Sequence, residues 1–172
     1  MKRGHTLGRG VRALAPLALV FAAAACGYSA GLRVKDSGLT SIGVEFFGNE
    51  TLERDLERDF QSELTRALRD AGADLEKEPG ALHVVRGTVR EYHRRSGIRS
   101  TDNQLLETGV YFAVDAALYA RDGKDPIRGP YQANTWVGFV IEPTGENERV
   151  ARERAMRHVA EELVLDLLTP VN

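Results

Sequence analysis

Apolar and polar residues alternate over residues 40–47, 81–92, 107–121 and 131–141, and this period of two predicts four strands. Residues 94–106 show no such alternation and indicate a polar loop. Residues 122–126 form a hairpin signal, Asp-Gly-Lys-Asp-Pro. The residues expected on the alternating apolar side are Ile42, Val44 and Phe46; Val85, Gly87 and Val89; Val110, Phe112, Val114, Ala116 and Leu118; and Thr135, Val137, Phe139 and Ile141.

Two further stretches carry an apolar residue every fourth position, which predicts two amphipathic helices. The first follows a cap at Asn49 or Thr51 and ends near Ala71, with Gly72 placed to stop it. The second covers about 147–168. Their apolar stripes are Leu52, Leu56, Phe60, Leu64 and Leu68, and Ala151, Ala155, Val159, Leu163 and Leu167.

The predicted order is strand, helix, three strands, helix. A four-stranded mixed sheet with both helices stacked on one face buries every apolar stripe, because each helix has only one. The predicted fold is therefore a two-layer α/β sandwich of the α+β class. The residues expected at the centre of its core are Phe60, Leu64, Phe112, Val114, Val159 and Leu163.

The chain begins with a basic stretch and an apolar run over 13–25, which together read as a secretory signal. The run spans about 20 Å as a helix, short of the ~30 Å hydrocarbon core, which argues against a transmembrane anchor. Small residues then precede Cys26, the only cysteine, in a pattern that resembles the lipobox of bacterial lipoproteins. The resemblance implies cleavage before Cys26 and covalent lipid on its thiol, and Gly27 implies export to the outer membrane. An ordinary signal peptide with an incidental cysteine is the alternative.

Three segments follow from this interpretation: a signal peptide over 1–25, a lipidated segment over 26–39 and a folded domain over 40–172. The signal carries four of the 23 basic residues, and the chain has 25 acidic ones, so the mature protein is acidic. An acidic balance argues against nucleic acid as a partner. With one cysteine the domain has no internal disulfide, so its stability must come from packing.

Candidate catalytic chemistry is sparse. The histidines after the signal, His83, His93 and His158, lack metal-ligand spacing, and no glycine-rich phosphate loop or Gly-x-Ser-x-Gly elbow occurs. Glu161 and Glu162 lie in an arginine-rich helix, where ion pairing is the simpler role. The sequence therefore predicts a protein that is not an enzyme and has no cofactor beyond the lipid.

Arginines gather in and after the second predicted strand. Alternation places Arg86 and Arg90 on the face that Val85 does not share, and Arg94 and Arg95 follow. Guanidinium groups bind phosphate bidentately, so these four are candidate ligand-binding residues for a phosphorylated glycolipid or an acidic surface. The alternative is a solvated sheet face that uses arginine for solubility.

Aromatic residues are expected on the same open face. They are Tyr92, Tyr111, Tyr119 and Trp136, and together they form a candidate partner interface, because aromatic and arginine side chains dominate binding hot spots. A covering loop would cancel this prediction, and a register slip of one residue would reverse it.

The pattern resembles the LPS-assembly lipoprotein family LptE. The mature chain opens with Cys26-Gly27-Tyr28, and a strand enters Phe-Gly-Asn-Glu-Thr at 47–51 before a helix. Gly-Thr-Val at 87–89, Ala-Leu-Tyr-Ala-Arg-Asp-Gly at 117–123 and a charged helix from near Glu146 follow in the same order. Ser29-Ala30 departs from the family's frequent His-Leu or His-Phe after the tyrosine.

This resemblance implies a lipoprotein on the periplasmic side of the outer membrane, held inside an LptD-type β-barrel that inserts lipopolysaccharide into the outer leaflet. Its role would be to support barrel assembly, with lipopolysaccharide as a bound ligand. The alternative is an outer-membrane lipoprotein that activates a periplasmic cell-wall synthase. Only about 14 residues separate Cys26 from the first predicted strand, which disfavours the long reach such activation needs.

Overall fold

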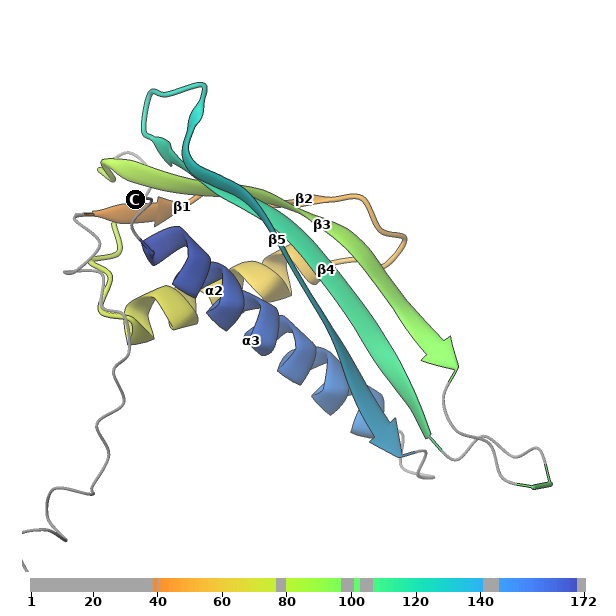
Figure 1. Cartoon of the computed structure of the whole chain (residues 1–172). Helices are drawn as coiled ribbons and strands as arrows, with labels where there is room; N and C mark the ends of the chain where they lie inside the picture. Colours follow the sequence, from red (N-terminus) through yellow and green to blue (C-terminus); the bar gives the residue numbers. More distant parts are fainter. Residues whose placement is uncertain are drawn as a thin grey trace, which may run out of the picture. The chain divides into compact units, whose positions relative to one another are not determined.

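The computed structural model describes residues 39, 41–76, 80–96, 101–102, 107–140 and 146–169, all within one unit that spans Leu32–Asn172. Its elements follow the predicted order, with the first strand divided in two (Figure 1). They are β1 (Ile42–Val44), β2 (Gly48–Asn49), α2 (Leu56–Asp70), β3 (His83–Ser96), β4 (Glu107–Ala120), β5 (Pro126–Val140) and α3 (Glu146–Leu168).

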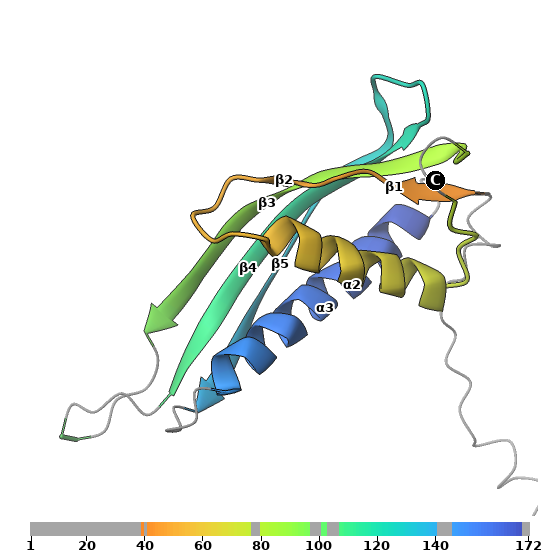
Figure 2. The same ribbon diagram turned by 180° about the vertical axis from the view of Figure 1, so that it is seen from behind.

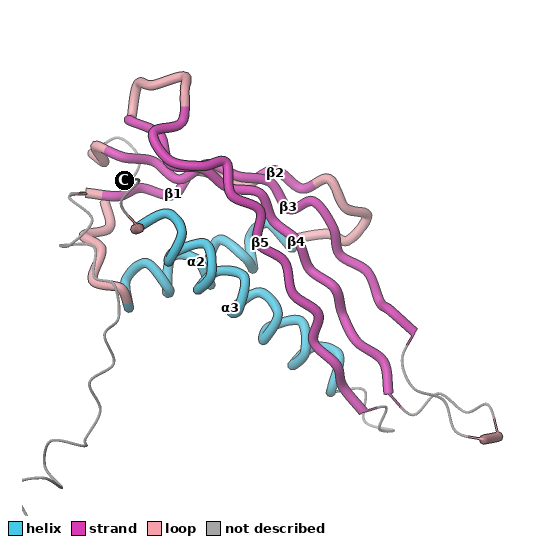
Figure 3. The backbone as a smooth tube through the Cα atoms, viewed as in Figure 1, coloured by secondary structure: helices cyan, strands magenta, loops and turns pink. Residues whose placement is uncertain are grey.

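The strands form one mixed sheet in the order β1-β3-β4-β5. β1 and β2 lie end to end and both pair in parallel with β3, whereas the β3–β4 and β4–β5 pairs are antiparallel (Figure 3). Both helices lie on the same face of this sheet, as the two opposite views show (Figures 1 and 2). The α+β, two-layer prediction is therefore confirmed.

The core lies between the helices and the sheet. All six residues predicted at its centre are fully buried, and so is nearly every member of the two helical stripes. Phe60 of α2 sits at the junction, with its ring 5.3 Å from Phe47 and 5.5 Å from Phe112 between centroids. The four-residue spacing on each helix thus identified the buried face correctly.

The start of α2 differs from the prediction. Asn49 and Thr51 do not cap the helix; the Asn49 side chain instead accepts hydrogen bonds from both the backbone N–H and the hydroxyl of Thr51, which builds a turn. The helix begins only at Leu56, so Leu52 lies in the preceding turn and is fully exposed instead of joining the apolar stripe. The end is as expected: Ala71 is the C-cap and Gly72 follows with a φ of 82°, which suits glycine.

The first strand also departs from strict alternation. Regular pairing stops at Val44 and resumes at Gly48, so Phe46 is 71% exposed and Phe47 is buried in its place. Gly87 of β3 makes room for this ring, because a Cβ at Gly87 would lie 2.9 Å from Cζ of Phe47. The predicted inward position of Phe46 is therefore wrong by one residue.

No helix among the described residues is long and apolar enough to cross a membrane. The predicted signal peptide, Cys26 and the rest of the 26–38 segment lie outside the described residues, as do Ile141 and Pro170. Part of the predicted 94–106 loop is strand, since β3 continues to Ser96.

Candidate functional site

The face of the sheet opposite α2 and α3, called the open face below, is covered by no helix or strand that the structure describes (Figure 2). Five of the eight predicted site residues have side chains whose contacts or cross-strand register put them on it: Arg86, Arg90, Tyr111, Tyr119 and Trp136. The faces predicted for the side chains of Tyr111, Tyr119 and Trp136 are thus confirmed.

Tyr92 and Arg94 are exceptions. The β3–β4 register shifts between Val89 and Glu91, so Arg90 occupies a bulge position. One extra residue exchanges the two faces beyond it. Tyr92 therefore packs edge-to-face against Phe112 on the helix side, with the ring centroids 6.5 Å apart.

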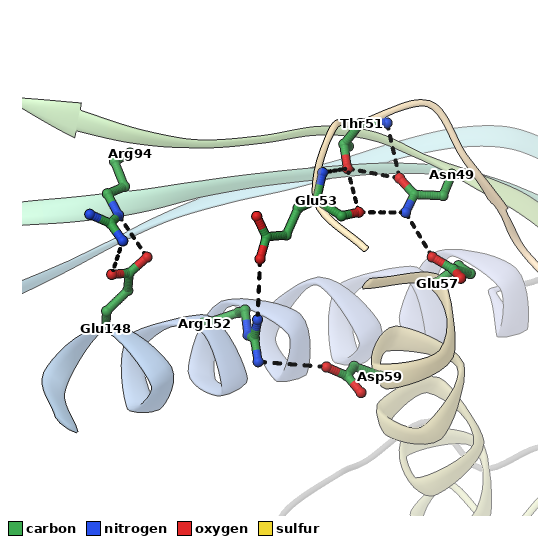
Figure 4. A network of polar contacts seen from close by, with 8 residues as sticks. All are labelled: Asn49, Thr51, Glu53, Glu57, Asp59, Arg94, Glu148 and Arg152. Atoms are coloured by element: carbon green, nitrogen blue, oxygen red, sulfur yellow. Dashed lines mark hydrogen bonds and ion pairs between the residues drawn. The ribbon is translucent and has the colours of Figure 1, made fainter. Parts of the chain in front are cut away.

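Arg94 also points to the helix side, where its Nε donates to Oε1 of Glu148 on α3 at 2.7 Å (Figure 4). The prediction that Tyr92 and Arg94 share the open face with Arg86 is therefore wrong. Arg95 lies in β3 with its backbone opposite Gly109.

An aromatic row crosses three strands of the open face. His93, Tyr111 and Trp136 are successive cross-strand partners, and the rings of His93 and Tyr111 lie 5.0 Å apart. The indole of Trp136 packs over Gly109, since a Cβ there would lie 2.5 Å from its Nε1. Trp136 remains 46% exposed. A large ring held in a fixed position yet still accessible is what an interface anchor requires.

Arg86 is tied to its surroundings at both ends of the guanidinium. Its Nε donates to Oε2 of Glu45 at 2.7 Å, and one terminal nitrogen donates to the carbonyl of Gly123 at 3.2 Å. The same group stacks over the ring of Tyr119, 4.8 Å from its centroid. Arg86 therefore already has a carboxylate and an aromatic partner within the domain.

Arg90 binds two carboxylate side chains, whereas Arg86 binds one. Its Nε donates to Asp115 at 2.6 Å, and a terminal nitrogen donates to both carboxylate oxygens of Glu50 at 2.6 and 2.7 Å. Hydrogen bonds to Glu50 and then to Asp115 raise the pKa of Arg90. Arg86 and Arg90, two of the four arginines predicted to bind phosphate, thus bind three carboxylates of the domain itself.

A shallow hollow of about 350 Å³ lies between these side chains. Its lining mixes charged, hydroxyl and small groups: Arg86, Gly87, Thr88, Arg90, Asp115, Ala116, Ala117, Tyr119 and Pro130. One oxygen of Asp115 is buried without a hydrogen-bond partner, so the hollow is not a purely cationic site.

A second polar cluster lies on the helix side, where the first half of α3 meets β3 and the turn before α2 (Figure 4). Arg152 reaches Asp59 of α2 at 3.7 Å and Glu53 of the turn at 4.0 Å. A hollow of about 280 Å³ beside this cluster is lined by Glu53, Tyr92, Glu148, Arg149 and Arg152. Burial, followed by the negative charge of Glu148, raises the pKa of Tyr92. The cluster ties α3 to the rest of the domain.

Sequence reasoning missed the partners that hold these side chains. Glu45, Glu50 and Asp115 come from three separate segments, and their approach to Arg86 and Arg90 depends on strand pairing. The role of Gly109 beneath Trp136 was also missed, although a glycine inside a strand is a recognised sign of close packing above it.

Among the residues that the structure describes, no three histidine, cysteine or carboxylate side chains gather as a metal site. His83, His93 and His158 belong to β3 and α3 and are not brought together as ligands.

Similar folds occur in solved bacterial proteins. A minor lipoprotein from Acinetobacter baumannii is 17% identical, with a TM-score of 0.51 over 75% of this chain and 90% of its own. Protein XCC0632 from Xanthomonas campestris, associated with the family model DUF330, is 12% identical, with a TM-score of 0.53 over 73% and 81%. The hypothetical protein CT253 from Chlamydia trachomatis is 10% identical, with a TM-score of 0.50 over 75% and 98%.

The chain has a fold found in a bacterial lipoprotein. At these identities the likeness concerns the fold alone. No family model matches the sequence. No curated protein matches it either.

Proposed function

We propose that this chain is an outer-membrane lipoprotein of the LptE type. In this role it is anchored through lipid on Cys26, docks with an LptD-type β-barrel on the periplasmic side, and supports insertion of lipopolysaccharide into the outer leaflet. The observation that carries the proposal is the open face with the accessible anchor Trp136.

The lipid anchor is supported by the small residues before Cys26 and by the basic and apolar segments that precede them. A fold shared with a minor lipoprotein agrees with this. Two or three acyl chains, at about 0.8 kcal/mol per buried methylene, hold a protein firmly on a membrane. The intact mass of the extracted protein should show cleavage before Cys26 plus a diacylglycerol; a free thiol on a chain that starts elsewhere would contradict the anchor.

Docking through the open face is supported by how its aromatic side chains are held. Tyr111 stacks near His93, Trp136 lies over Gly109, and Tyr119 lies beneath Arg86. Fixed aromatic and arginine side chains lose little entropy on binding and dominate hot spots. The face is therefore suited to a protein partner.

Direct phosphate binding by Arg86 and Arg90 has weaker support. A lipopolysaccharide phosphate would have to compete with Glu45, Glu50 and Asp115, which already accept hydrogen bonds from these guanidinium groups. Barrel docking is thus the better supported part of the role, and glycolipid binding would accompany it only where these ion pairs open.

Site-specific photocrosslinking in the host cell tests the docking face. A benzophenone amino acid at position 136 should crosslink to an outer-membrane barrel. The same group at position 165, where Leu165 is 50% exposed on α3, is the matched control on the opposite face and should not. Crosslinks from position 165 alone would contradict the docking face, and capture of a penicillin-binding protein at position 136 would favour the cell-wall alternative.

A further inference from the structure

We propose that residues 32–38, the segment that leads into the domain, dock in an acidic groove between α2 and α3. The groove has a volume of about 200 Å³ and is lined by Ala67, Asp70, Ala71, Glu161, Val164 and Leu165. This docking goes beyond the proposed barrel binding and does not depend on it. It concerns the two helices, whereas barrel binding concerns the open face.

The base of the groove is apolar. Leu165 of α3 is 50% exposed, although Val164 beside it is buried. The side of the groove formed by α2 carries the small side chains of Ala67 and Ala71, which are only partly buried. Small residues opposite an exposed leucine leave room for an apolar side chain, and covering Leu165 would remove apolar surface from water.

The rim of the groove is negative. Asp70 is 73% exposed and its ion pair with Arg66 is 3.9 Å long, so this pair holds the carboxylate only weakly. Glu161 lies on the α3 side and is exposed. Residues 159–168 contain three acidic residues and no basic one, so no cation in the last turn of α3 offsets the negative end of the helix. The groove therefore suits an occupant that carries cations beside apolar side chains.

Residues 32–38, Leu-Arg-Val-Lys-Asp-Ser-Gly, have this composition. Leu32 and Val34 alternate with Arg33 and Lys35, and a single acidic residue follows. In an extended chain the two apolar side chains share one side, which allows both to enter the groove. The long basic side chains can then bend back so that their charged ends reach the acidic rim.

The segment ends within reach of the groove. Leu39 is buried in the core, and the backbone N–H of Ile42 donates to the carbonyl of Asp74 at 3.0 Å. Three residues separate Leu39 from Ile42, and three separate Asp74 from Ala71 of the groove. Because three residues span at most about 11 Å, Leu39 lies within about 25 Å of Ala71, and seven extended residues cover about 24 Å.

A segment of the same chain has an advantage over any separate occupant. Its tether gives it a high effective concentration, whereas a second copy or another protein loses translational freedom on binding. Docking would leave five free residues after Cys26, 27–31, instead of the twelve of 27–38. The reach of the tether would fall from roughly 45 Å to roughly 20 Å, which would hold the domain close to the membrane. This consequence alone rests on the proposed lipid anchor.

Paired cysteines in the full chain, in its membrane, test the docking. Val34→Cys with Leu165→Cys places one thiol on the segment and one in the groove, and mild oxidation should join most of them within one chain. Val34→Cys with Glu162→Cys is the matched control and should stay mostly reduced, because Glu162 is exposed on the same turn of α3 but does not line the groove. Free thiols are counted after denaturation by the gel shift that a maleimide polymer adds.

Three outcomes would overturn the docking. Equal oxidation of both pairs would reflect chance collisions of a free segment. A lack of oxidation in both pairs would show that the segment does not reach the groove. A disulfide between two chains in the pair with Leu165→Cys would assign the groove to a second copy.

Wild type reports on the lipid anchor separately. Cys26 is the only cysteine, so a lipidated chain adds no polymer and a chain with a free thiol adds one. A free thiol would contradict the anchor and leave the docking to be decided by the same two pairs in a Cys26→Ser chain.

Charge variants of the pair with Leu165→Cys give an independent measurement. Glu161→Lys should slow disulfide formation about two- to fivefold, the effect of one exposed ion pair, and high salt should remove the difference. Glu162→Lys makes the same change of charge outside the groove and should leave the rate unaltered. If both variants have the same effect, the groove does not select a basic segment and the proposal is wrong.

Discussion

Gly109 of β4 lies directly beneath the indole of Trp136 on β5, and a Cβ at position 109 would come within 2.6 Å of Cζ2 of that ring. The pair explains why a large aromatic side chain keeps a fixed place on the open face while remaining accessible.

We therefore expect Gly109→Ala to push the indole away and to cost about 1–3 kcal/mol of unfolding free energy. Trp136 is the only tryptophan, so its fluorescence emission should shift to longer wavelength as the ring leaves the sheet. Gly123→Ala, in the β4–β5 hairpin, is the control and should leave the emission unchanged. An unaltered spectrum in Gly109→Ala would contradict the close packing.

The core prediction concerns leucines on the two helices. Leu64→Ala and Leu163→Ala remove fully buried side chains and should each lower the free energy of unfolding by about 2–5 kcal/mol in urea titrations. Leu165→Ala on the exposed side of α3 and Leu52→Ala in the exposed turn should each cost under about 0.5 kcal/mol. Equal losses in buried and exposed variants would show that the helix faces are misassigned.

Alkaline pH should weaken the domain through Tyr92. Burial, reinforced by Glu148, raises the pKa of this phenol above its usual 10.0. The unfolded chain therefore releases the proton first, so the stabilisation is complete below pH 10 and is lost as the pH rises through the folded-state value. Unfolding curves between pH 9 and 11 should show a steeper decline for wild type than for Tyr92→Phe. Identical slopes would exclude this linkage.

Charge reversal at Arg90 tests whether its carboxylates are structural partners. Arg90→Glu would oppose Glu50 and Asp115, so the denaturation midpoint should fall, whereas Arg90→Lys should keep most of the stability. Arg154→Glu, on the exposed side of α3, is the control and should change the midpoint little. Unchanged midpoints in both reversals would show that the ion pairs of Arg90 with Glu50 and Asp115 contribute little to stability.

The sequence was sufficient for the architecture because its strongest signals are long. The four-residue spacing from Leu56 to Leu68 and the alternation from Val110 to Leu118 each extend over several turns or residue pairs, and tertiary packing agrees with both. Given the order of the elements, a mixed sheet with both helices on one face is the arrangement that buries the apolar stripes of the helices and strands.

The residues placed on the wrong face follow a point where one extra residue interrupts the alternation of the strand. Nothing local marks Arg90 as a bulge, yet it moves Tyr92 and Arg94 to the helix side. Likewise the break in strand pairing after Val44 leaves Phe46 exposed and buries Phe47 in the core. A period-two pattern cannot reveal an added residue, because each half still alternates correctly.

The predicted start of α2 was wrong for a different reason. Asn49 and Thr51 are typical capping residues, but in this chain they bond to each other and to the following turn. Their side-chain chemistry suits both roles, and only the position of Leu56 over the core decides between them.

Depletion of the protein in its own host tests the proposed function most directly. If the chain supports an LptD-type barrel, then lowering its level should reduce the amount of folded barrel and of lipopolysaccharide at the cell surface. Expression of the wild-type chain should restore both, and expression of Cys26→Ala should not. If surface lipopolysaccharide and barrel levels hold steady while cell-wall synthesis declines, the transport role is wrong.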